Sequence, residues 1–278
     1  IDTLVLIDRQ VDLVTPLLTP LTYEGLIDEF LTIQNSYIKV DPKILEDDDD
    51  PDSKKHGDKP VTLALNSNDV LYADIRNYNV QKLGSYLQEK AKHVQEQYAT
   101  FRGNKKGMEL GDMRSFVRKI PELQKTYKAL TNHIALVEVI KTKTSMPEFN
   151  ELWQTERMML EGETEYDKLE EMMAVQQPLV KVLRLLCLQS LTNGGIKAKA
   201  FDHLRRELLQ TWGFELLFTL NNLEKLEMLK RKESNWIEKD SSWDHLRNGL
   251  KLIKDDVDAF EPDDIAYVTS GYAPLTCR

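Results

Sequence analysis

The chain of 278 residues is poor in cysteine, in net positive charge and in long apolar runs. Cys187 and Cys277 are its only cysteines and form no CxxC pair, which is typical of a reducing compartment such as the cytosol. The net charge of -9 disfavours a general affinity for nucleic acid or anionic lipid, and favours a protein partner. No apolar run approaches the roughly 18 residues that cross a bilayer, so we expect any membrane association to be indirect, through partners.

Motifs of catalytic and cofactor-binding sites are also missing. The sequence contains no P-loop and no GxGxxG, HExxH or GxSxG string, and its five histidines lack partners at metal-site spacing. Asp8 follows an apolar segment, as the nucleophile of aspartyl phosphotransferases does, but Gln10 replaces the second Asp of their DxDxT motif. We therefore predict no catalytic residue, no metal and no cofactor. A phosphotransferase fragment that uses Asp8 remains an alternative.

Both ends of the chain predict strands of an α/β sheet. Thr3 to Asp8 contains the apolar run LVLI, which is typical of a buried parallel strand, and Ile265 to Val268 precedes the turn residues Gly271 and Pro274. The chain opens on Ile1 within the first of these runs, as expected of a fragment. The pattern favours a mainly helical domain inserted into an α/β sheet and cut out with its flanking strands.

The middle of the chain predicts two long amphipathic helices joined by a tight tip. Apolar residues recur at steps of three and four after an N-cap at Ser67 or Asn68, and again after the basic tip RGNKKG. About 31 residues at 1.5 Å each give an arm on the order of 45 Å, so the hairpin at 69–143 should project into solvent and grip another helix. Its apolar track includes Leu83, Leu87, Val94, Tyr98, Met113 and Val117.

Pro121 lies inside the second of these helices. A proline there removes one backbone hydrogen bond and clashes with the preceding turn, at a cost of about 3 kcal/mol, so the helix is expected to kink or break. Two interpretations remain open: a plain boundary between two shorter helices, or a functional hinge.

The remaining segments predict a loop and a second, compact lobe. Glu46 to Pro60 is a charged stretch with almost nothing to bury, so we expect a mobile loop without chemistry. Beyond it, the predicted lobe helices are 147–160, 165–176, 178–193, 199–212, one that begins at Asn221 or Asn222, and 243–258.

Part of this lobe resembles a winged helix. A helix, a turn, a second helix and a possible wing at Ser234 to Glu238 come in that order, and the basic cluster at 230–232 follows the second helix. Three cations in a chain of net charge -9 make a poor nucleic-acid footprint. We attribute them instead to the dipole at a helix C-terminus, and keep a winged-helix nucleic-acid binder as an alternative.

Four strings carry a resemblance that covers nearly the whole chain. They are LVLIDRQVDLVTPLLTPLTYEGLIDEF at 4–30, PLVKVLRLLCLQSLTN at 178–193, LRRELLQTWGFELLFTLNNLEKLEMLK at 204–230 and DIAYVTSGYAPL at 264–275. In this order they resemble the Sec-one/Munc-eighteen (SM) family, chaperones that bind SNARE helices during vesicle fusion. TYEGLIDEF, LQTWGF and NNLEKLEMLK look most like its vacuolar subtype, the SM subunit of the HOPS and CORVET tethering complexes.

The resemblance implies a mainly α fold, namely domain 3 of an SM protein, with a long helical hairpin, a helical lobe and short α/β remnants of domain 2 at both ends. In that scheme residues 1–25 and 263–278 are the domain 2 remnants. Subdomain 3a, which carries the hairpin, covers 26–145, and subdomain 3b covers 146–262.

The resemblance also implies a function that is not enzymatic. SNARE helices would be templated on the hairpin, along the apolar track defined above, with Pro121 as the hinge. Subdomain 3b would dock vacuolar protein sorting-associated protein sixteen and other HOPS or CORVET subunits through Arg205, Phe214 and Leu217. Core packing remains the alternative for the two apolar residues. The protein would be cytoplasmic and held on late endosome, vacuole or lysosome membranes by its partners.

Overall fold

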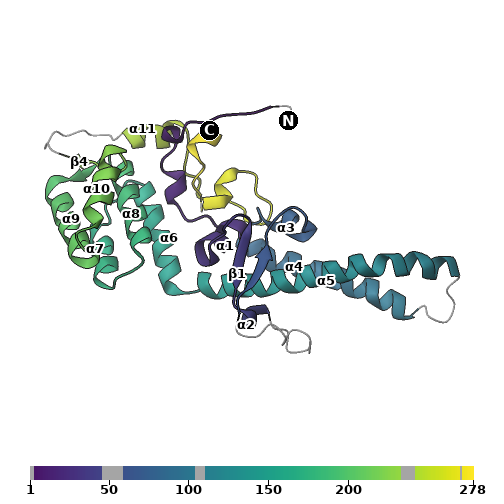
Figure 1. The fold of residues 1–278 in the computed structure, drawn as a ribbon. Helices are drawn as coiled ribbons and strands as arrows, with labels where there is room; N and C mark the ends of the chain where they lie inside the picture. The colour runs from purple at the N-terminus through teal and green to yellow at the C-terminus, as the bar shows by residue number, and fades with distance from the viewer. Residues whose placement is uncertain (1–2, 46–58, 104–109, 233–241, 270) are drawn as a thin grey trace. The chain divides into compact units, whose positions relative to one another are not determined.

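A computed structural model describes residues 3–45, 59–103, 110–232, 242–269 and 271–278, with the backbone alone at 98–103 and 110–119 (Figure 1). The chain divides into two compact units. The helical lobe combines residues 1–19, 147–258 and 262–278, and the hairpin unit combines 20–146 with 259–261. Both units are mainly helical, as predicted. How they correspond to the subdomains named above stays a prediction.

The hairpin unit combines helices with a small antiparallel sheet. In the sheet Tyr37 pairs with Ala64, and burial alternates along the first strand, with Ile38 and Val40 inside. The elements are α1 (Tyr23–Leu31), β1 (Tyr37–Val40), α2 (Pro42–Leu45), β2 (Val61–Ala64), α3 (Val70–Ile75), α4 (Val80–Gly103) and α5 (Leu110–Thr144).

Helix α1 begins after the capping residue Thr22, at a point where Pro20 packs closely against Gly25. The Thr22 hydroxyl accepts a hydrogen bond from the Gly25 N–H at 3.3 Å, which satisfies one of the free donors of the first turn. A Cβ at Gly25 would clash with the Pro20 ring, so glycine is required there. Tyr23 and Leu26 lie on one face of α1 and are buried.

The predicted pair of long helices is present, with one correction. The first arm does not start at Ser67 or Asn68, because Asp69 caps the short helix α3 and a new helix starts at Val80. The Asn79 side chain accepts from the Gln81 N–H at 3.0 Å and so helps to start α4. Helices α4 and α5 then lie side by side, over 24 and 35 residues (Figure 1).

Helix α5 runs through Pro121 without a break. The interpretation of Pro121 as a plain helix boundary is therefore wrong. Proline removes one backbone hydrogen bond from a 35-residue helix, and the hydrogen bonds of the turns on either side keep the helix continuous. The hinge role stays a prediction.

The helical lobe confirms the sequence prediction most closely. Its first four helices lie within two residues of the predicted bounds at each end. They are α6 (Pro147–Leu160), α7 (Tyr166–Ala174), α8 (Leu179–Thr192) and α9 (Ala198–Trp212). The rest of the lobe contains β3 (Ile196–Lys197), α10 (Leu216–Lys225), β4 (Arg231–Lys232), α11 (Ser242–Gly249) and the 3-10 helices η1 (Arg9–Val11), η2 (Thr15–Leu17), η4 (Ile265–Thr269) and η5 (Leu275–Cys277).

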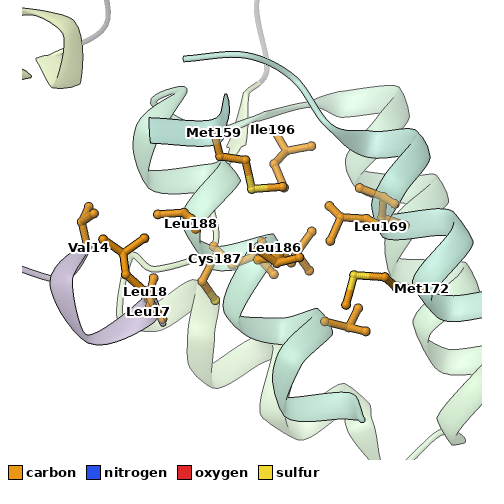
Figure 2. Close-up of a cluster of buried hydrophobic side chains, with 14 of the residues drawn as sticks. Val14, Leu17, Leu18, Met159, Leu169, Met172, Leu186, Cys187, Leu188 and Ile196 are labelled. Atoms are coloured by element: carbon orange, nitrogen blue, oxygen red, sulfur yellow. The ribbon is translucent and has the colours of Figure 1, made fainter. Parts of the chain in front are cut away.

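Helix α8 is buried on most of its surface and forms the centre of the lobe's core. Val14, Leu17 and Leu18, from the segment around η2, belong to the same cluster, and Figure 2 shows them on the side of Cys187 and Leu188. Burial raises the pKa of the Cys187 thiol to about 12, so it is a neutral core side chain. Both cysteines are free, as expected from their spacing.

A buried polar clamp fixes the end of the N-terminal segment to two lobe helices. The Glu156 carboxylate of α6 accepts from the Thr19 N–H at 3.0 Å and from its hydroxyl at 2.7 Å. Arg184 of α8 donates to the Leu17 carbonyl at 3.1 Å and lies 3.6 Å from Glu156. The buried Glu156 carboxylate is thus paired with the partly buried Arg184 and hydrogen-bonded, as burial of a charge requires.

The strand predictions at the two ends are wrong. Thr3 to Asp8 has no regular secondary structure, and Leu4 and Leu6 are exposed. Ile265 to Val268 lies in the 3-10 helix η4. A strand needs neighbours for its backbone hydrogen bonds, and no strand of the described residues pairs with either segment.

Two further lobe predictions are corrected, and two fall outside the described residues. Helix α10 starts at Leu216, not at Asn221 or Asn222, because Leu216 and Leu220 continue one buried face. Helix α11 ends at Gly249, well before residue 258. The predicted wing at Ser234 to Glu238 and most of the predicted loop at 46–60 are not described.

Candidate functional site

A buried hydrogen-bond network joins three elements at the base of the hairpin. The Tyr23 hydroxyl of α1 lies 2.7 Å from Nδ1 of His133 on α5, and Nε2 of His133 lies 3.1 Å from Oδ2 of Asp69, the cap of α3. The Tyr72 ring stacks on the imidazole with ring centroids 6.0 Å apart. These contacts fix where α5 leaves the body of the hairpin unit.

The electrostatics of this network favour a neutral phenol and an ionised carboxylate. Burial, aided by Tyr72 and Asp69, raises the pKa of Tyr23 well above its usual value. Burial also raises the pKa of Asp69, but hydrogen bonds from His133 and from the Tyr72 N–H outweigh it, and the net shift is downward. These distances match the tautomer in which His133 accepts from the Tyr23 O–H at Nδ1 and donates from Nε2 to Asp69.

The predicted apolar track is buried where its side chains are described. Leu83, Leu87 and Val94 are 0%, 3% and 6% exposed, on a helix that packs along α5. The expectation that these three form an exposed track is therefore wrong, because each helix of a two-helix arm needs the other to cover its apolar face. The side chains of Tyr98, Met113 and Val117 lie outside the described residues. Contact of any of the six with a SNARE stays a prediction.

A feature that we did not predict lies on the surface of α4. Lys82, Tyr86 and Lys90 follow each other at steps of four, which places them along one ridge of α4, and Tyr78 lies two residues before the helix begins. All four are partly exposed. We call this set the Tyr–Lys ridge. Its signal, alternating Tyr and Lys at steps of four, is visible in the sequence, but apolar periodicity does not reveal it.

In the lobe, the three residues predicted to bind the tether subunit lie on or beside α9 and α10. Arg205 donates to Glu224 at 2.9 Å and to Asn221 at 2.8 Å, and so joins the two helices. Phe214 is 74% exposed, which rules out core packing for its side chain, and Leu217 is half-buried. Phe218, which the prediction omitted, is 73% exposed and extends the apolar surface of α10.

The basic cluster at 230–232 is not at a helix C-terminus, so the dipole explanation is wrong. These residues lead into and form β4, and each one has a partner within the lobe. Lys230 pairs with Glu227 at 2.9 Å, Arg231 with Asp202 at 2.8 Å, and Lys232 donates to the Asn193 carbonyl at 3.1 Å. The hydrogen bond from Arg231 lowers the pKa of Asp202.

Asp8 and Asp12 have structural partners. Asp8 is exposed and accepts from the Gln10 N–H at 2.8 Å, which caps η1. Asp12 is buried and accepts from the N–H groups of Val14, Thr15 and Leu275 at 3.1, 2.9 and 3.0 Å, and from the Thr15 hydroxyl at 2.6 Å. Asp12 therefore ties the two terminal segments of the lobe together, a role that the sequence did not reveal.

The described residues show neither a metal-binding cluster nor a helix that could span a membrane. They contain no group of three or more His, Cys, Asp or Glu side chains placed to hold a metal ion. None of their helices is long and apolar enough to cross a membrane.

Comparison with known proteins places this arrangement in a family. The sequence profile of the Sec1 family matches residues 1–278. Vacuolar protein sorting-associated protein 33A of Rattus norvegicus is 41% identical over 289 residues, covering 100% of this chain and 46% of the relative's length. The chain thus spans about half of that relative, and the predicted vacuolar subtype is confirmed.

Solved structures show the same fold. The Unc18–syntaxin 1 complex from Monosiga brevicollis matches 97% of this chain and 45% of that one, with a TM-score of 0.62 and 16% identity. The SM protein Vps45 in complex with the Qa SNARE Tlg2 matches 75% of this chain and 36% of that one, with a TM-score of 0.51 and 21% identity. At these identities the likeness concerns the fold alone. A helical hairpin and a helical lobe with this fold, and a profile match over its whole length, mean that the chain belongs to the Sec1 family.

Proposed function

We propose that this chain is a SNARE-binding chaperone module that acts in vesicle tethering and fusion at the late endosome, vacuole or lysosome. The observation that carries the proposal is the α4–α5 hairpin, anchored at its base by Tyr23, His133 and Asp69, in a chain of the Sec1 family. Its likeness to a protein-33A sequence supports the vacuolar setting, and its likeness to Vps45, solved with a Qa SNARE, supports the partner class.

The proposed mechanism is templating without covalent chemistry. Nucleating a helix is unfavourable, because several residues must be fixed before the first hydrogen bonds form. A rigid two-helix arm that holds a SNARE helix against it lowers this cost and sets the register for the next helix. A binding role of this kind requires no catalytic residue, metal or cofactor, and any membrane contact is made through partners.

The test is binding of fluorescein-labelled SNARE-motif peptides of each class to the full chain, followed by fluorescence anisotropy. At least one motif should bind more tightly than its scrambled sequence. Val94→Asp should abolish that binding, because a charge in the buried hairpin seam disrupts the arm. Val180→Asp, at an exposed valine of the lobe, is the matched control and should leave binding unchanged. If no motif binds above its scrambled control, the proposal is wrong.

We also propose that the lobe surface formed by Arg205, Phe214 and Leu217 docks vacuolar protein sorting-associated protein sixteen and, through it, other HOPS or CORVET subunits. Exposed aromatic side chains and arginines are enriched at the centre of protein interfaces. Phe214→Ser should weaken capture of that subunit about tenfold or more. Val180→Ser removes a similarly exposed apolar group and should not. Equal capture by both variants would contradict this docking surface.

A further inference from the structure

The Tyr–Lys ridge is held together by contacts among its own members. The Lys82 ammonium lies 4.6 Å from the centroid of the Tyr78 ring, and the Lys90 ammonium lies 5.2 Å from that of Tyr86. The two rings meet edge to face with centroids 5.1 Å apart. Each cation therefore rests on an aromatic face, and the two pairs contact each other.

Asp74 anchors one end of the ridge. Its carboxylate accepts from the Tyr86 hydroxyl at 3.2 Å and lies 3.9 Å from the Lys90 ammonium. Four side chains that would otherwise be mobile are thus restrained before any partner arrives. Binding to a pre-ordered surface avoids much of the entropy that exposed lysines lose on complex formation.

The charges of the ridge are not balanced. Lys90 has Asp74 beside it, whereas Lys82 has no carboxylate within ion-pair distance among the described residues. An ordered ammonium without a counter-charge, on a chain of net charge -9, is suited to a specific carboxylate and not to a polyanion.

The geometry of the ridge fits a helix. Residues at steps of four form one of the ridges that pack into the grooves of a neighbouring helix. Lys82 and Lys90 are about 12 Å apart along the axis, which a partner helix matches with two residues about eight positions apart.

We infer that the Tyr–Lys ridge is the docking line for an acidic amphipathic helix, which sets a carboxylate against Lys82 and apolar side chains over the rings of Tyr78 and Tyr86. The inference rests on the proposed function, and it names the surface and the partner chemistry of the SNARE-binding arm. In this inference the Tyr–Lys ridge takes the place of the predicted apolar track as the binding surface of α4, because the described side chains of that track are buried against α5.

The experiment compares two charge reversals on the same helix in the anisotropy assay, with the SNARE-motif peptide that binds the unaltered chain. Lys82→Glu should weaken binding about tenfold or more, since it sets like charges together. Lys92→Glu makes the same change at an exposed lysine outside the ridge, and should weaken binding less than twofold. Both residues are solvent-accessible, so circular dichroism should confirm that both variants keep their helical content.

A charge swap between the peptide and Lys82 distinguishes a direct contact from a structural effect of the substitution. Changing the acidic residue of the peptide that faces Lys82 to Lys should weaken binding to the unaltered chain and restore binding to the Lys82→Glu variant. Failure of every acidic position to rescue overturns the ridge as a docking line.

The remaining outcomes separate this inference from the proposed function. If the unaltered chain binds a SNARE motif and Lys82→Glu does not weaken it, or weakens it no more than Lys92→Glu does, the ridge inference is wrong and the proposed function stands. If Lys82→Glu reduces binding to phosphatidylserine vesicles but not to the peptide, the ridge is a lipid contact and the inference is again wrong. If no SNARE motif binds, the ridge inference and the proposed function are both wrong.

Discussion

At the scale of single residues, the hairpin unit depends on His133, which joins α5 to α1 and to the cap of α3. Among the histidines that the structure describes, His133 alone is buried, with Tyr23 on one side and Asp69 on the other. Tyr23 is 110 residues away in sequence and Asp69 is 64 away, so no local pattern links the three. Their meeting follows from the packing of α5 against α1 and α3.

His133→Ala should lower the free energy of unfolding of the hairpin unit by about 2 to 4 kcal/mol. The change leaves the buried Tyr23 hydroxyl without its partner and creates a cavity beneath Tyr72. Urea unfolding followed by far-UV circular dichroism measures it. His93→Ala, at an exposed histidine of α4, is the control and should cost about 0.5 kcal/mol or less. Similar losses for the two variants would show that the network adds little.

Asp69 should make the stability of the hairpin unit depend on pH in the acid range. Its pKa is lower in the folded chain, so its contribution is present above the usual value of about 3.9 and is lost as pH falls through the folded value. The unaltered chain should therefore lose more stability between about pH 5 and pH 3 than Asp69→Asn does. Urea midpoints at the two pH values test this. Parallel losses in both chains would exclude Asp69 as a cause.

At the scale of elements, the role of Pro121 can be tested directly, because α5 continues through a residue that destabilises a helix interior. Pro121→Ala should stabilise α5, by up to about 3 kcal/mol, and should change the affinity for the SNARE-motif peptide if the weak point is used as a hinge. Urea unfolding and anisotropy measure the two effects. Glu122→Ala, at the next and exposed position, is the control. A stabilised helix with unchanged affinity would remove the hinge role.

The element predictions that failed share a physical cause. Helices α6 to α9 were predicted closely because their hydrogen bonds are internal and their caps and turns are local in sequence. The end segments were predicted as strands from apolar runs, but a strand is completed by its neighbours, and the described residues provide none. The start of α10 was predicted too late, because Asn221 or Asn222 was taken as the N-cap. Both residues lie inside the helix, whose buried face already begins at Leu216.

At the scale of the whole molecule, the chain carries two compact units with separate cores. The described tryptophans, at 153, 212 and 243, all belong to the helical lobe, and the fourth, Trp236, lies within its sequence range. Tryptophan fluorescence therefore reports on the lobe, whereas far-UV circular dichroism reports on both units.

Leu83→Asp should unfold the arm and leave the lobe folded. Leu83 is fully buried in the hairpin unit, and an unpaired charge there costs several kcal/mol. The helical signal should fall, while the tryptophan unfolding midpoint in urea should move by no more than its error. Gln81→Asp, at an exposed position of the same helix, should affect neither signal. A shift of both signals together would mean that the two units unfold as one.

The sequence by itself determined the helical class, the presence of two long antiparallel helices, the bounds of most lobe helices and the family, because helical periodicity, caps and family motifs are read along the chain. Only the tertiary structure decided which faces are covered. It turned Leu83 and Leu87 inward, left Phe214 exposed, gave Asp12 a partner at Leu275, and brought His133 between Tyr23 and Asp69. Burial depends on what packs against a residue, and those neighbours are distant in sequence.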